Sequence, residues 1–252
     1  MATPTPTPYR SPWTQPVEFG AQLRAAWTGL RRPGLARRIL PGLRAHLGAA
    51  PASTAYAFTL FVTWWTLRGV GNTVEHRLIF SASTNLHNMR EQPVQVLVAS
   101  AFWTEGGFPW AVIVGFLVVM AYAERWLGTL RWIMVFATGH IGASLLTVTA
   151  IAHAIDRGVI PVKVAVATDV GSSYGFSAVL AALSFRFVSP ARWILAGAFL
   201  AVLVASLWIG PTFTDYGHLC AAGIGVVIGS CASLLWRWLE KNGHAEAAKH
   251  QR

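Results

Sequence analysis

The sequence predicts an all-α, polytopic membrane protein, and three observations support that prediction. Apolar residues make up 54% of the 252 residues, whereas Asp, Glu, Lys and Arg together make up only 12%. Six apolar segments are each long enough to cross a bilayer as a helix, for which about 17 to 25 residues are needed. Charged or Pro/Gly-rich connectors separate these segments. We therefore expect a bundle of six transmembrane helices.

Composition divides the chain into four parts. Residues 1–16 form a Thr/Pro-rich tail that we expect to be disordered, because it suits neither a helix nor a core. A basic amphipathic cytoplasmic segment follows over residues 17–50, then the membrane domain over 51–238 and a polar cytoplasmic tail over 239–252. The six spans are expected at residues 54–70, 107–123, 130–153, 172–188, 191–209 and 215–236.

The basic segment repeats apolar side chains at helical spacing, at Phe19, Leu23, Trp27 and Leu30, with arginines around and after them. This pattern predicts a helix on the anionic inner leaflet, so membrane lipids are expected partners. A solvated basic linker is the alternative interpretation.

The distribution of Lys and Arg predicts the orientation. With the N-terminus in the cytoplasm, the inner segments hold 15 of the 20 basic residues and the outer segments hold five. The positive-inside rule then places both termini in the cytoplasm of a multi-pass cell-membrane protein. The net charge of +10 follows from this topology. A nucleic-acid partner is not expected, because the basic residues flank spans and form no patch with aromatic residues.

Metal and cofactor chemistry is not indicated. The eight histidines show no metal-binding spacing, and no Gly-rich loop follows a strand. Cys220 and Cys231 lie eleven residues apart on the last span, roughly 16 Å along a helix, which is too far for a disulfide between them.

A serine and a histidine are expected at matched depth. Asp169 and Asp215 mark the outer water edge of two spans, and Ser173 and His218 follow them by four and three residues. At 1.5 Å per residue both lie about 5 to 6 Å below that edge. Ionisable groups in a membrane usually face the protein interior, so His218 is expected to point inward.

Such a pair permits nucleophilic acyl transfer. Imidazole takes the hydroxyl proton as serine attacks a carbonyl, and backbone N–H groups at a helix N-terminus stabilise the oxyanion. Ser172, Tyr174 and Ser177 are further candidates at this site. Ser177 is also an alternative nucleophile, but Ser173 leaves the longer helix below it. The alternative interpretation is that these residues only pack helices together.

Small residues predict close helix packing. Gly217, Ala221, Gly225 and Gly229 recur every fourth residue of the last span, and Gly171 and Gly175 lie beside the serines. Such stripes allow neighbouring helices to approach closely.

These motifs, in this order, resemble the rhomboid family of intramembrane serine proteases. Gly171-Ser172-Ser173 resembles its G-x-S motif, Gly217-His218 its histidine motif, and Glu124 with Gly128 part of its second-helix motif, over about residues 52–237. The resemblance implies a serine-type endopeptidase, a hydrolase of single-span membrane proteins, with Ser173 as nucleophile and His218 as general base. The alternative is an inactive pseudoprotease that binds membrane-protein clients.

Two departures bear on activity. The family's second helix supplies a histidine and an asparagine to the oxyanion, where register from Glu124 gives Phe108 and Val112 here. Losing one such donor costs about 3 to 4 kcal/mol of transition-state stabilisation. Tyr174 replaces the glycine that follows the nucleophile. His140 is a candidate compensating donor, with helix packing as the alternative role.

Overall fold

The computed structural model describes residues 11–31, 33–209 and 212–249, and these residues form helices and connectors with no strand. A single parallel bridge pairs Val17 with Phe187. The α-helices are α1 (Phe19–Arg31), α2 (Leu35–Gly48), α3 (Pro51–Arg68), α4 (Asn72–Ala82), α5 (Leu86–Glu91), α6 (Pro93–Phe102), α7 (Trp110–Gly115), α8 (Ala121–Leu127), α9 (Thr129–Asp156), α10 (Ser173–Leu183), α11 (Ala191–Ile209) and α12 (Phe213–Lys249). The remaining turns are the π-helix η1 (Phe116–Met120) and the 3-10 helices η2 (Val162–Val166) and η3 (Ser184–Arg186).

Helices occupy all six predicted span positions, and four of them are long and apolar enough to cross a membrane. The other two helices, α3 and α10, do not meet this combined criterion of length and hydropathy. The helix α3 has 18 residues but carries several hydroxyl side chains, and α10 has only 11 residues. At 1.5 Å per residue α10 covers about 16 Å, roughly half of a hydrocarbon core. The four candidate spans are Trp110–Leu127, Thr129–Asp156, Ala191–Ile209 and Phe213–Asn242.

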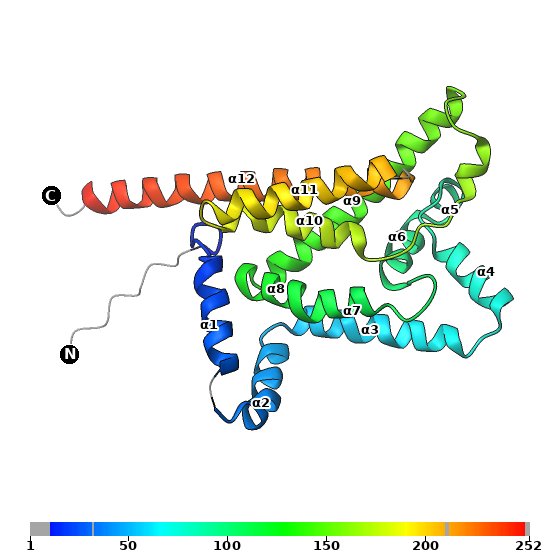
Figure 1. Cartoon of the computed structure of the whole chain (residues 1–252). Helices are drawn as coiled ribbons and strands as arrows, with labels where there is room; N and C mark the ends of the chain where they lie inside the picture. Colours follow the sequence, from blue (N-terminus) through cyan, green and yellow to red (C-terminus); the bar gives the residue numbers. More distant parts are fainter. Residues whose placement is uncertain (1–10, 32, 210–211, 250–252) are drawn as a thin grey trace.

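The short helix α10 lies between α9 and α12 at the centre of the bundle (Figure 1). Glycines make this contact close. A Cβ on Gly139 of α9 or on Gly225 of α12 would meet Ala178 of α10, and one on Gly229 would lie 2.8 Å from the Ala182 carbonyl oxygen. The small-residue stripe of the sequence therefore faces α10.

A buried carboxylate anchors the start of α3. Glu124 of α8 is 1% exposed and accepts hydrogen bonds from the backbone N–H groups of Ala52 (3.0 Å) and Ser53 (2.7 Å). The hydroxyl of Thr129 donates to the same carboxylate at 2.8 Å. Because the first N–H groups of a helix have no intrahelical partner, this carboxylate caps α3 from a neighbouring helix.

The structure describes the predicted tail at residues 1–16 only from residue 11. Residues 1–10 lie outside the described part of the chain, whereas 11–16, expected to belong to the disordered tail, pack against the protein. Trp13 is 5% exposed, and the N–H of Val17 donates to the Arg186 carbonyl at 2.7 Å. The buried side chain of Trp13 anchors this segment in the hydrophobic core, which a Thr/Pro-rich composition does not reveal.

Helices also form in the two segments that flank the predicted membrane domain. The basic segment forms the two helices α1 and α2, which leave Trp27 and Leu40 exposed. Within α1, the guanidinium of Arg31 lies over the Trp27 ring. At the other end α12 continues to Lys249, so the predicted tail at 239–252 begins as helix.

Candidate functional site

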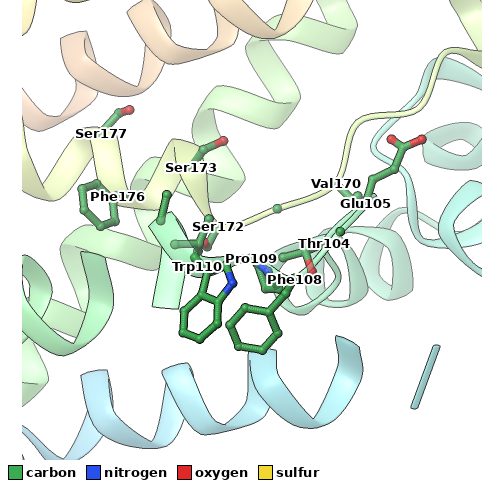
Figure 2. A pocket seen from close by; sticks show the side chains of 14 residues that line it. Thr104, Glu105, Phe108, Pro109, Trp110, Val170, Ser172, Ser173, Phe176 and Ser177 are labelled. Carbon is green, nitrogen blue, oxygen red and sulfur yellow. The ribbon is translucent and has the colours of Figure 1, made fainter. Parts of the chain in front are cut away.

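A cavity of about 700 Å³, which we call the serine cavity, opens between the loop before α7 and the start of α10. One side is aromatic, formed by Phe108, Trp110 and Phe176. The other side carries the hydroxyl residues Ser172, Ser173 and Ser177 (Figure 2). The cavity therefore combines an apolar wall with polar groups from a helix N-terminus.

None of the three serine hydroxyls bonds to another described residue. Ser173 is the first residue of α10 and is exposed, whereas Ser172 and Ser177 are 3% and 6% exposed. Figure 2 shows the hydroxyls of Ser173 and Ser177 pointing to the same side of α10, away from the Phe176 ring. Ser172 occupies the N-cap position without capping the helix, so the first N–H groups of α10 have no side-chain partner there.

The backbone before Ser173 is fixed from α6. Gly171 has a φ of +130°, which favours glycine, and its N–H donates to the Ser100 carbonyl at 2.7 Å. The carbonyl of Ser172 accepts from the N–H of Phe176 at 3.0 Å. These contacts set the direction in which α10 begins.

His218 lies on the first turns of α12, half-buried, and does not line the serine cavity. Its ring packs edge to face on Tyr174, with centroids 5.3 Å apart and an interplanar angle of 79°. Among the described residues no hydrogen bond joins His218 to Ser173 or to Ser177. Proton transfer requires heavy atoms about 3 Å apart, so these groups would have to approach one another before a proton could pass.

Tyr174 fills the space between α10 and α12. It is 2% exposed, and a Cβ on Gly217 would run into its phenol ring. The sequence analysis named Tyr174 as a site candidate in place of a glycine. The structure shows that its ring packs against the ring of His218.

Asp169 joins three separate segments of the chain. This carboxylate is 9% exposed and accepts hydrogen bonds from the hydroxyls of Tyr174 (2.8 Å), Thr84 (2.9 Å) and Thr214 (3.4 Å). Burial raises the pKa of Asp169, and the hydrogen bonds from Tyr174 and Thr84 offset part of that rise. The sequence analysis used Asp169 as a marker of the water edge, and the structure shows that it cross-links three segments.

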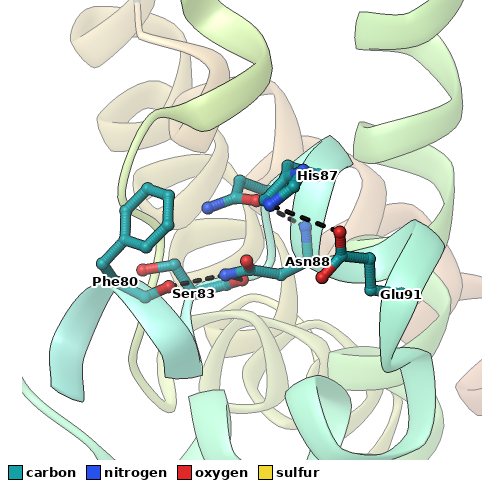
Figure 3. Close-up of polar contacts among 6 residues, drawn as sticks. Phe80, Ser83, His87, Asn88 and Glu91 are labelled. Carbon is teal, nitrogen blue, oxygen red and sulfur yellow. Dashed lines mark hydrogen bonds and ion pairs between the residues drawn. The ribbon is translucent and has the colours of Figure 1, made fainter. Parts of the chain in front are cut away.

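Thr84 is held in place by a polar turn between α4 and α5 (Figure 3). The side-chain amide of Asn88 donates to the carbonyls of Phe80 (2.5 Å) and Ser83 (3.0 Å). An ion pair of 3.6 Å between the exposed side chains of His87 and Glu91 lies on the solvent side of this turn. The connector after α4 is thus ordered where it meets Asp169.

His140 does not reach the serine cavity. It is 4% exposed on α9, and its Nε2 lies 3.1 Å from both the Ser100 hydroxyl and the Leu97 carbonyl oxygen. Ser100 is 1% exposed, so this serine–histidine pair is closed to substrate and ties α6 to α9. Sequence analysis missed Ser100, because nothing in its local pattern marks the contact.

Phe108 and Val112 both line the serine cavity and offer no side-chain hydrogen-bond donor. Their register differs from a straight helix, because α7 begins only at Trp110 and η1 is a π-helix. A π-helical turn inserts one extra residue into the helix, which rotates the side chains of the preceding residues about the helix axis. The Phe108 ring packs on Trp64 and Trp110, with centroid distances of 4.5 and 4.2 Å.

A family model described as rhomboid-like protein matches residues 45–236. The chain belongs to the rhomboid-like protein family. Its apolar helices and this membership make it an integral membrane protein of the rhomboid type. The matched region contains the serine cavity, Ser173 and His218, and it leaves out α1. No curated protein and no solved structure matches the chain.

Among the described residues no three His, Cys, Asp or Glu side chains gather as metal ligands.

Proposed function

We propose that this rhomboid-like protein of the cell membrane binds an extended segment of a membrane-protein client in the serine cavity, without cleaving it. The observation that carries the proposal is the position of His218, which packs on Tyr174 while Ser173 stands exposed and unpaired in the cavity. A serine without a base is a weak nucleophile.

The chemistry of the cavity supports a peptide as ligand. The aromatic wall suits apolar side chains, and unpaired hydroxyls with the free N–H groups of α10 suit backbone amides of an unwound segment. At about 700 Å³ the cavity holds several residues of an extended chain rather than an entire helix.

A second candidate function is intramembrane serine endopeptidase activity, favoured by the exposure of Ser173 at a helix N-terminus. The Ser173 Oγ would attack the scissile carbonyl, and His218 would take its proton and return it to the leaving amine. This reaction requires Ser173 and His218 to approach within about 3 Å of one another. It also lacks side-chain oxyanion donors at Phe108 and Val112, which predicts slow turnover.

Binding is tested with synthetic single-span peptides in nanodiscs, one with a Gly-Pro break near its outer end and one with a continuous leucine helix. We expect the wild type to bind the broken peptide more tightly, because only an unwound segment exposes backbone amides. Ser173→Phe should weaken that binding by filling the cavity, whereas Ser230→Phe, at a partly exposed position of α12 that does not line the cavity, should not. Equal binding of both peptides, or of both variants, would contradict the proposal.

Mass spectrometry of the same samples separates the two candidate functions. Binding without new peptide termini supports the client-binding function. Products that disappear in both Ser173→Ala and His218→Ala would establish the endopeptidase in its place.

A further inference from the structure

A second cavity, of about 150 Å³, lies at the opposite end of α10 from Ser173, and we call it the arginine cavity. It is bounded by residues 13–16, by the connector after α10 and by α12. Three arginines from three different elements line it: Arg186 of η3, Arg192 of α11 and Arg237 of α12. No Asp or Glu is among its described lining residues.

Arg186 is the buried member of this group. It is 5% exposed, and its Nε and Nη1 have no hydrogen-bond partner in the described part of the chain. Burial lowers its pKa to about 10, so the guanidinium remains charged at neutral pH. A buried charge without a partner is unfavourable, which makes an anion the missing component of the cavity.

The backbone of Arg186 is held by the segment before α1. Its carbonyl accepts the N–H of Val17 at 2.7 Å, and the neighbouring Phe187 forms the bridge to Val17. Trp13 packs against the core beside it. The residues before α1 therefore form a wall of the arginine cavity.

The other two arginines retain donors for the same ligand. Arg192 donates from Nη2 to the Phe185 carbonyl (2.7 Å) and from Nε to the Ser184 carbonyl (3.3 Å), which leaves its Nη1 hydrogens. Arg237 is exposed at the rim. The nearest acid along α12, Glu240, accepts the Thr14 hydroxyl at 2.5 Å and does not line the cavity.

We propose that the arginine cavity binds a phosphate group, supplied either by an anionic phospholipid headgroup or by a free phosphate ion. Guanidinium groups bind phosphate oxygens through paired, charge-assisted hydrogen bonds. The volume suits a group of this size and lies well below the 300 Å³ at which sites for drug-sized ligands begin. The positive-inside rule expects this end of α10 at the inner leaflet, where anionic headgroups are found.

The test measures the thermal unfolding midpoint of the full chain in nanodiscs. One arm replaces phosphatidylcholine by phosphatidylglycerol, and the other adds inorganic phosphate to phosphatidylcholine discs at constant ionic strength. We expect the wild-type midpoint to rise in at least one arm, because a ligand that binds only the folded state stabilises it. A rise with lipid alone identifies the headgroup, and a rise with inorganic phosphate identifies the free ion as sufficient.

Arg186→Met is the decisive variant. It should lose the ligand-dependent rise while remaining as stable as the wild type in pure phosphatidylcholine, because the substitution removes an unpaired buried charge. Should Arg186→Met fail to fold, Arg237→Met at the exposed rim should raise the half-saturating ligand concentration about tenfold.

The matched control is Arg90→Met on α5, which removes an exposed arginine that neither lines the cavity nor belongs to the basic segment 17–50. It should keep the wild-type rise. An equal loss of the rise in Arg90→Met and the cavity variants would show general surface electrostatics and overturn the proposal. The absence of any wild-type rise in both arms would overturn it as well.

Discussion

A glycine-to-alanine substitution, which adds a single methyl group, should have opposite effects on stability at two glycines of α12. A Cβ on Gly225 would lie 2.9 Å from both the Cα and the carbonyl carbon of Ala178, and would contact the carbonyl oxygen as well. Carbon atoms pack at about 3.5 to 4.0 Å, and both surfaces here are backbone, so the helices must move apart. Overpacking of this kind costs about 1 to 3 kcal/mol.

Gly223 is the matched control, two residues earlier on the same helix. Nothing lies within 4 Å of the position that its Cβ would occupy. Gly223→Ala should therefore stabilise the helix by about 0.5 to 1 kcal/mol through propensity alone. For a chain of this size each kcal/mol shifts the midpoint by about 2 to 4 °C.

Thermal unfolding of both variants in the same detergent gives the comparison. Gly225→Ala should lower the midpoint by roughly 2 to 12 °C, and Gly223→Ala should raise it slightly. Equal shifts in one direction would refute the close packing of α12 on α10.

Three further predictions concern buried polar groups. Glu124→Gln should lower stability by about 1.5 to 3 kcal/mol in chemical denaturation, because the N–H groups that start α3 lose a charged acceptor; an unchanged midpoint would exclude that capping role. Ser100→Ala should cost about 1 kcal/mol in the same assay and leave peptide binding unchanged, since the pair with His140 lies outside the serine cavity. Asp169 has a raised folded-state pKa, so the folded protein binds a proton more readily than the unfolded chain and gains stability as the pH falls through that value. In a His218→Gln background, the midpoint relative to Asp169→Asn should therefore rise as the pH is lowered, and a fall would contradict this assignment.

The helices and their small-residue contacts could be predicted because they follow from local pattern. Apolar runs between charged connectors located the helices at the six span positions, and the stripe from Gly217 to Gly229 faces α10 as its spacing suggested. The length of α10 was overestimated. The helix ends at Leu183, and residues 184–188 of the predicted span form a 3-10 turn and part of a connector.

The site itself depends on contacts that the local pattern does not encode. Thr84 and Asp169, which form a hydrogen bond, are 85 residues apart. The carbonyl of Ser100 accepts a hydrogen bond from the N–H of Gly171, and the Ser100 hydroxyl bonds to His140 on another helix. The π-helix at Phe116–Met120 has no sequence signature that we recognised, and it changes the register on which Phe108 was placed. Matched depth predicted that Ser173 and His218 lie near the same level, but it could not predict that Tyr174 would occupy the space beside the histidine.

Covalent labelling by a fluorophosphonate probe tests the central claim most directly. The probe reacts with a serine only when a base activates it. We expect no labelling of the wild type, of Ser173→Ala, of Ser177→Ala or of His218→Ala, under conditions that label an active serine hydrolase. Wild-type labelling that is lost in Ser173→Ala and His218→Ala but kept in Ser177→Ala would contradict the account and establish the serine–histidine pair as catalytic.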